Sequence, residues 1–180
     1  NGTNRNTLLF RDPTVDGLKT GHTDAAGYCL VATAKRSVPN AGERRLISIL
    51  LGAASDSARA NESQKLLNWG YTAYDAVKLF DGGQAVATPK AWKGAQSTVK
   101  MGSEKPIVIT VPSGSGGKVE TQVVSQEPLI APIAKGQKLG TLKATVDGQQ
   151  VAEVPLVALE AVDEAGFFGR LWDSIRLWIK

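Results

Sequence analysis

Residues 84–162 carry the feature that most constrains the fold: short segments rich in β-branched residues, separated by turn residues. A run of Pro, Ser and Gly at 112–117 and the pair Asp147-Gly148 each lie between two such segments. Asp-Gly and Gly-rich turns between alternating segments are typical of β-hairpins. The pattern therefore predicts a small all-β domain over residues 84–162, with a hairpin at each of these two turns.

Residues 1–83 have a different texture, with strand and helix signals in succession. We expect an extended segment at 14–23, strands at 27–34 and 45–51 joined by a polar loop at 35–43, and a helix at 58–79. Trp69 and Tyr74 fall on the apolar stripe of that helix and are predicted core residues. Because a helical period gives way to a strand period near Asp81–Gln84, we expect the domain boundary there.

Three strands and one helix cannot cover both faces of a sheet. We therefore expect residues 1–80 to expose an apolar face, and to dimerise, to exchange segments between copies or to be loosely ordered. The expected architecture is thus an incomplete layer of strands and helix, followed by the small all-β domain.

The last segment, residues 166–180, is apolar at positions that share one side of a helix and includes two tryptophans. Arg170, Asp173 and Ser174 fall on the far side, so the segment is predicted to be an amphipathic helix. Two interpretations stay open. The helix either docks on the β-domain or lies in the headgroup plane of a membrane.

Composition excludes several classes of function. The 21 Lys and Arg against 17 Asp and Glu give a net charge of +4, too small and too dispersed to indicate a nucleic-acid partner. A single cysteine, Cys29, and a single histidine, His22, argue against an internal disulfide framework and a structural metal site. No stretch is long and apolar enough for a transmembrane helix, and the N-terminal residues do not resemble a signal peptide. The chain is then either cytosolic or targeted by a segment that lies elsewhere.

The sharpest local signal is Lys19-Thr20-Gly21, which follows the turn Asp16-Gly17 on an expected strand. A lysine and a hydroxyl can bind a carboxylate, and a glycine lets another backbone approach closely. An edge strand can also pair with an extended peptide. The plainer alternative is an exposed strand end with a turn glycine.

More of the chain supports the first interpretation. Lys-Thr-Gly is one of the signature boxes of penicillin-binding proteins. The segments Asn4–Asn6, Val15–Tyr28 and Arg59–Gly70 closely resemble the low-molecular-mass penicillin-binding proteins that act as D-alanyl-D-alanine carboxypeptidases, the penicillin-binding protein 5 type. The resemblance extends through the β-rich part to the terminal helix.

The resemblance implies three parts. Residues 1–83 would be the C-terminal portion of an α/β transpeptidase domain of β-lactamase-like fold. Residues 84–162 would be the all-β second domain, and residues 163–180 an amphipathic membrane-anchoring helix. It also implies a serine-type hydrolase that removes the terminal D-alanine of peptidoglycan pentapeptides and binds β-lactams. Such a protein would be periplasmic and peripheral on the inner membrane, with the helix at 167–180 on the lipid surface. No cofactor, metal or nucleic acid is implied.

Carried over residue by residue, Lys19 and Thr20 would hold the substrate's terminal carboxylate, and Gly21 would leave room for the peptide. The backbone N–H of His22 would be one oxyanion donor. Arg5 and Arg59 match arginines near that carboxylate, although surface ion pairs would explain them equally well. Strict alternation would put Lys19 and Thr20 on opposite faces, so we expect a twisted edge strand.

The family's catalytic serine is absent from this sequence. Its Ser-x-x-Lys and Ser-x-Asn boxes precede Lys-Thr-Gly, yet neither precedes Lys19 here. The only Ser-x-x-Lys, Ser97 to Lys100, lies downstream in the expected β-domain and is interpreted as a coincidence. We therefore expect a chain that is inactive alone and needs the missing N-terminal part of the protein.

The sequence also allows two non-catalytic alternatives. The chain could be a positioning and interaction module anchored to the membrane surface, and this is compatible with the catalytic interpretation. A stand-alone carbohydrate-binding domain is disfavoured, because residues 84–162 contain a single aromatic residue, Trp92.

Overall fold

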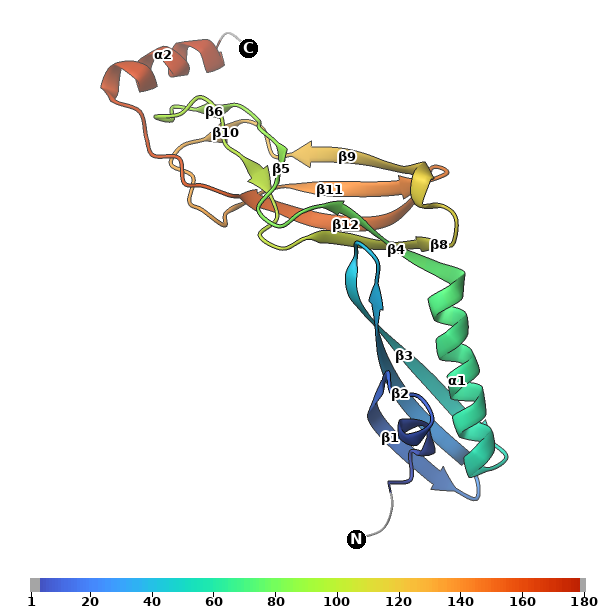
Figure 1. Cartoon of the computed structure of the whole chain (residues 1–180). Helices are drawn as coiled ribbons and strands as arrows, with labels where there is room; N and C mark the ends of the chain where they lie inside the picture. The colour runs from blue at the N-terminus through green and yellow to red at the C-terminus, as the bar shows by residue number, and fades with distance from the viewer. Residues whose placement is uncertain (1–3, 179–180) are drawn as a thin grey trace. The chain divides into compact units, whose positions relative to one another are not determined.

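The computed structural model of the chain describes residues 4–178, apart from the side chains of Phe168 and Leu177. This part is mostly β-strand, with two α-helices and two short 3-10 helices (Figure 1). In chain order the elements are η1 (Thr7–Phe10), β1 (Val15–Thr23), β2 (Gly27–Val38), β3 (Gly42–Ala53), α1 (Asp56–Ala73), β4 (Tyr74–Phe80), β5 (Ala85–Ala87), β6 (Ala91–Trp92), β7 (Met101–Gly102), β8 (Ile107–Pro112), η2 (Gly116–Lys118), β9 (Val119–Ser125), β10 (Leu129–Ile130), β11 (Lys138–Val146), β12 (Gln149–Ala158) and α2 (Phe167–Trp178).

Contacts divide the chain into two compact units. The first holds the residues up to Ala76 together with Val111–Gly114, and the second holds Val77–Thr110 with the residues from Ser115 on. The predicted domain limits at residues 83 and 162 remain predictions.

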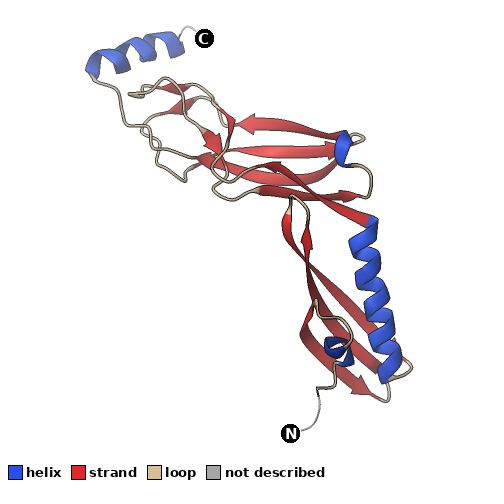
Figure 2. Ribbon diagram, in the orientation of Figure 1, coloured by secondary structure: helices blue, strands red, loops and turns tan. Residues whose placement is uncertain are grey.

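The first unit is an antiparallel sheet in the order β1-β2-β3, with α1 lying along one face (Figure 2). Its core joins that face of the sheet to the helix and to η1. The buried apolar residues are Leu8, Val15, Leu30, Ala32, Ala34 and Leu67. Tyr71 packs against this core and donates a hydrogen bond from its hydroxyl to the Ala34 carbonyl (2.8 Å). One face of the sheet is thus closed by helix side chains.

Helix α1 begins at a capped end and is shorter than the sequence predicts. The Ser55 hydroxyl accepts a hydrogen bond from the Ala58 N–H (3.0 Å), as an N-cap should. The predicted helix at 58–79 is wrong at its C-terminal end, because Tyr74–Phe80 forms strand β4, paired with β8. The Asp75 carboxylate accepts hydrogen bonds from the Ser113 hydroxyl and the Gly114 N–H, so tertiary pairing overrides the local helical spacing.

The two aromatic residues assigned to the core of this helix are also mispredicted. Trp69 is 57% exposed and Tyr74 is 37% exposed. Their rings meet edge to face at 5.7 Å, outside the core. Helical spacing predicts which side chains share one side of the helix, but it does not predict how many of them the sheet buries.

The hairpin that joins β2 and β3 is longer than expected. The polar segment predicted as a loop over 35–43 is mostly strand, since β2 runs to Val38 and β3 begins at Gly42. Lys35 and Glu43 form a cross-strand ion pair at 2.6 Å. Polar cross-strand pairs extend the two strands beyond the apolar core, and the pattern of apolar residues in the sequence does not predict this extension.

The face of the sheet opposite α1 carries exposed apolar side chains, as predicted. Ile47, Ile49 and Leu51 alternate along β3 and are 61%, 63% and 72% exposed. Their neighbour Ser48 is 2% exposed on the helix side. The predicted one-sided cover of this sheet is confirmed, whereas dimerisation or segment exchange stays a prediction.

Apart from the short η2, the second unit is all-β up to α2. Its main sheet has the order β5-β7-β12-β11-β9, and β10 pairs with β6. The hairpin predicted at Asp147-Gly148 is confirmed by antiparallel β11 and β12, with positive φ at both turn residues (48° and 80°). The hairpin predicted around residues 112–117 is wrong, because β8 pairs with β4 and β9 pairs with β11. The loop between β8 and β9, which contains η2, connects two different sheets.

Two further features bear on function. Trp92 is 8% exposed, and the Lys90 ammonium lies 3.4 Å from its ring centre, so this aromatic side chain is not displayed as a sugar platform would require.

Helix α2 confirms that a helix follows the β-rich part; residues 179 and 180 of the expected span lie outside the described residues. No helix between residues 4 and 178 combines the length and apolarity needed to span a bilayer.

Candidate functional site

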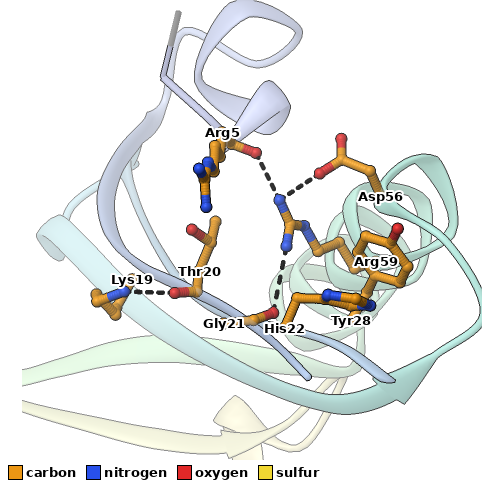
Figure 3. A pocket seen from close by; sticks show the side chains of 8 residues that line it. All are labelled: Arg5, Lys19, Thr20, Gly21, His22, Tyr28, Asp56 and Arg59. Carbon is orange, nitrogen blue, oxygen red and sulfur yellow. Dashed lines mark hydrogen bonds and ion pairs between the residues drawn. The ribbon is translucent and has the colours of Figure 1, made fainter. Parts of the chain in front are cut away.

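A pocket of about 480 Å³ opens at the end of β1 in the first unit. All six residues singled out from the sequence line it, together with two that were not (Figure 3). The lining residues are Arg5, Lys19, Thr20, Gly21, His22, Tyr28, Asp56 and Arg59. The structure thus brings together residues that are up to 54 positions apart in the chain.

Strand β1 is positioned to offer this pocket an open backbone edge. Among the described strands it has a neighbour, β2, on one side only. Lys19, Thr20 and Gly21 are paired in register with Val31, Leu30 and Cys29. An edge strand of this kind can accept an extended peptide by main-chain hydrogen bonding.

Lys19 and Thr20 follow the alternation of the strand. Thr20 is paired with the buried Leu30, on the face that α1 covers, so Lys19 belongs to the opposite face. The Lys19 ammonium folds back and donates to the Thr20 carbonyl at 2.5 Å. Both residues line the same pocket because the long lysine side chain bends around the strand edge.

Arg59 is the most enclosed member of the site, with 3% of its surface exposed. Its guanidinium donates to the Arg5 carbonyl (2.8 Å) and to the Gly21 carbonyl (3.3 Å), and it forms an ion pair with Asp56 (Figure 3). It also lies 5.5 Å from the centre of the Tyr28 ring. Arg59 therefore ties the N-terminal segment, the end of β1 and the start of α1 to one another.

Arg5 and Thr20 form the more open part of the pocket. The guanidinium of Arg5 and the side chain of Thr20 point toward one another in Figure 3. Arg5, Lys19 and Arg59 bring three cationic groups to the pocket, against the single carboxylate of Asp56. An excess of cations beside a hydroxyl suits an anionic guest such as a carboxylate.

Gly21 and His22 end the strand. A Cβ placed on Gly21 would lie 3.7 Å from the Cβ of Cys29, an ordinary van der Waals distance. The chain itself therefore does not require glycine there on steric grounds. The His22 ring lies tilted by 38° against the Tyr28 ring, with 4.0 Å between the ring centres, and belongs to the pocket wall.

The start of β1, before Lys19, is held by a charged network, and Asp16-Gly17, expected to form a turn, belongs to the strand itself. Arg45 donates two hydrogen bonds to the Asp16 carboxylate (2.6 and 2.7 Å), and the Thr33 hydroxyl donates a third (2.5 Å). The hydrogen bonds from Arg45, with that from Thr33, hold the pKa of Asp16 well below its usual range. The network links β1 to β2 and β3 just before the Lys-Thr-Gly segment.

The downstream Ser-x-x-Lys does not have the arrangement of a nucleophile and base. Ser97 to Lys100 is not helical, and the Lys100 ammonium pairs with Glu160 at 3.2 Å. Both residues belong to the second unit. Their geometry is consistent with the interpretation as a coincidence.

Tyr28 and Asp56 were missed as site residues. Tyr28 is paired with His22 across the turn at 24–26, so it follows from the register of the hairpin. Asp56 lies one turn before Arg59 at the start of α1, a spacing at which opposite charges meet. Both signals are visible in the sequence once the hairpin and the helix start are placed.

Two family models match this chain. The family described as "D-alanyl-D-alanine carboxypeptidase" matches residues 1–55, and the family described as "Penicillin-binding protein 5, C-terminal domain" matches residues 74–164. The chain belongs to the D-alanyl-D-alanine carboxypeptidase family of the penicillin-binding protein 5 type.

Individual relatives support the same assignment. The chain is 40% identical to the D-alanyl-D-alanine carboxypeptidase DacC of Escherichia coli (strain K12), over 97% of this chain and 43% of the relative. It is 37% identical to DacA of Haemophilus influenzae, over 98% and 44%. Penicillin-binding protein 5 from H. influenzae superposes with a TM-score of 0.77 at 36% identity, over 89% of this chain and 46% of that one. The chain thus spans less than half the length of these relatives.

Proposed function

We propose that this chain supplies the carboxylate-binding edge of a serine-type D-alanyl-D-alanine carboxypeptidase, and that it performs no turnover by itself. The observation that carries the proposal is the pocket at the end of β1. There Lys19, Thr20 and Arg5 gather around an edge strand with an excess of positive charge. The proposed substrate is the peptidoglycan pentapeptide, with β-lactams as inhibitors that use the same edge.

In the proposed mechanism the substrate's C-terminal segment pairs with β1. Its terminal carboxylate lies against the Thr20 hydroxyl and the nearby cations, and the bare Gly21 backbone lets the chain approach. The His22 N–H donates to the carbonyl oxygen as negative charge develops there. Arg59 acts through its bonds to the Gly21 and Arg5 carbonyls, which keep the edge in place.

The attacking serine and the base that takes its proton belong, in this proposal, to polypeptide outside these 180 residues. The serine oxygen adds to the carbonyl of the terminal amide, and D-alanine leaves with a proton as the acyl-enzyme forms. Water then hydrolyses the ester. Because peptidoglycan is outside the cytoplasm, the proposed place of action is the periplasmic side of the inner membrane.

A fluorescent penicillin tests this proposal. We expect the purified chain to remain unlabelled under conditions that label full-length E. coli DacC. Covalent labelling would contradict the proposal. A chain carrying Ser97→Ala then shows whether Ser97 is the acylated residue.

A second proposed function is that of a positioning module that holds the enzyme on a lipid surface through residues 167–180. It is supported by α2, whose side chains Leu171, Trp172 and Ile175 are 51%, 60% and 46% exposed. Arg176 lies beside Trp172 at 5.7 Å, a pairing suited to the headgroup region. Vesicle flotation of the chain, against a chain ending at Val162, tests this role. Equal flotation of the two would remove it.

A further inference from the structure

Helix α2 contacts the β-rich unit through a polar side chain. The Asp173 carboxylate accepts a hydrogen bond from the Lys93 N–H at 2.7 Å, in a half-buried setting. Asp173 is half-buried, whereas Leu171 and Ile175 are exposed. At about 100° per residue, Asp173 projects from nearly the opposite side of the helix to Leu171. The helix therefore docks by its polar side and turns its apolar side away from the protein.

The turn around Lys93, which donates this hydrogen bond, is shaped by its contacts with α2 and the segment before it. Lys93 has a positive φ of 58°, which non-glycine residues rarely adopt. Its carbonyl accepts from the Ala165 N–H (2.8 Å), so both of its backbone groups bond to the segment that leads into α2 or to α2 itself. Next to it, a Cβ on Gly94 would lie 2.7 Å from Val162 Cγ1 and 2.8 Å from the Gln96 carbonyl. The turn is closely packed and leaves little freedom for the helix base.

We propose that Asp173 is a positioning residue that fixes the direction in which α2 presents its apolar side to an anionic phospholipid surface. This inference rests on the second proposed function. The charges fit that partner, since Arg176 lies at the margin of the apolar side, beside Trp172, as at a headgroup boundary. Arg170, on the far side of the helix, pairs with Glu164 instead. Without the Asp173 contact, α2 would still bind lipid, but the β-rich unit would not be held at one angle to the surface.

Amide hydrogen exchange without lipid tests the contact. Asp173→Ala should speed exchange of the Lys93 amide by about tenfold, because that N–H loses its carboxylate acceptor. Asp173→Asn keeps a side-chain oxygen at the same place and should restore most of the protection. Ser174→Ala is the matched control on the same helix, since the Ser174 hydroxyl bonds only to the Arg170 carbonyl in the structure. Equal Lys93 exchange in the Asp173→Ala and unchanged chains would overturn the inference.

Energy transfer on vesicles tests the consequence. A donor is attached at Gln122→Cys in a Cys29→Ser background, and acceptor lipids are placed in vesicles of phosphatidylethanolamine and phosphatidylglycerol. Asp173→Ala should leave the bound fraction unchanged within twofold and widen the distribution of donor-to-surface distances at least twofold. In Asp173→Asn and Ser174→Ala this distribution should stay as narrow as in the unchanged chain. Equal widths would overturn the inference. If the unchanged chain does not bind vesicles, the membrane function and the lipid partner proposed above are refuted. The exchange rate of the Lys93 amide tests the contact between Asp173 and Lys93 independently of lipid.

Discussion

The two units of this chain differ in how their sheets are covered. In the second unit β11 buries Leu139, Leu142 and Ala144, each about 1% exposed. In the first unit α1 covers one face of the sheet, and β3 leaves Ile47, Ile49 and Leu51 exposed on the other. The second unit therefore buries its own core, whereas the first is a layer with one apolar face uncovered and an open edge beside it.

The largest expected effect comes from the covered face of the first unit. Leu67→Ala removes a side chain that is 2% exposed and leaves a cavity under the sheet. The free energy of unfolding should fall by about 2–5 kcal/mol. Ile49→Ala, on the uncovered face, should change it by less than about 0.5 kcal/mol. Denaturant titration followed by circular dichroism measures both, and equal losses would show that the two faces do not differ as described.

Arg59 should give the next largest effect. Arg59→Ala leaves the Gly21 and Arg5 carbonyls without their buried donor and Asp56 without its partner. We expect a loss of about 1–3 kcal/mol in unfolding free energy, with faster amide exchange at the end of β1. Arg11→Ala, which removes an exposed hydrogen bond to Asn61, is the control and should cost little. Unchanged amide exchange at the end of β1 in the Arg59→Ala chain would refute the proposal that Arg59 holds this edge in place.

The uncovered face predicts self-association. Ile47, Ile49 and Leu51 offer a continuous apolar strip that a second copy can cover. Sedimentation velocity should show a sedimentation coefficient that rises with concentration, and the pair Ile47→Lys and Ile49→Lys should suppress that rise. A monomer at every concentration would show that the uncovered face does not mediate self-association.

The smallest effect concerns the charged network before Lys19. The lowered pKa of Asp16 means that its bonds to Arg45 stabilise the folded chain above the unfolded pKa, near 3.8, and that this stabilisation is lost as the pH falls toward the folded value. Arg45→Ala should therefore lower stability slightly at neutral pH and not at all at strongly acidic pH. Both groups are half-exposed, so salt should weaken the effect. A stability difference independent of pH would contradict the assignment.

Much of the candidate site followed from short-range signals. Lys19-Thr20-Gly21 predicted an extended edge strand, and among the described residues β1 is a strand at the end of its sheet. The turn expected at Asp16-Gly17 is wrong, because both residues lie in β1, where the pairing with β2 is irregular. Asp147-Gly148 fixed the β11–β12 hairpin because its two residues tolerate positive φ. Local chemistry of this kind needs no knowledge of distant partners.

The errors share a physical cause. The end of α1 and the pairing of β8 both depend on the contact between β4 and β8, two segments separated by about thirty residues whose local patterns permit other structures. The exposure of Trp69 depends on how wide a strip the sheet covers. Such features are decided by tertiary partners that periodicity does not identify.

Titration of the isotope-labelled chain with a peptide ending in D-alanyl-D-alanine, followed by amide chemical shifts, tests most directly whether the edge of β1 binds the substrate's carboxylate. We expect shifts confined to β1 at Lys19–His22 and to the pocket wall, which disappear when the peptide's C-terminus is amidated and weaken severalfold in Thr20→Ala. Equal shifts for the acid and the amide, or shifts that centre on another part of the chain, would contradict it.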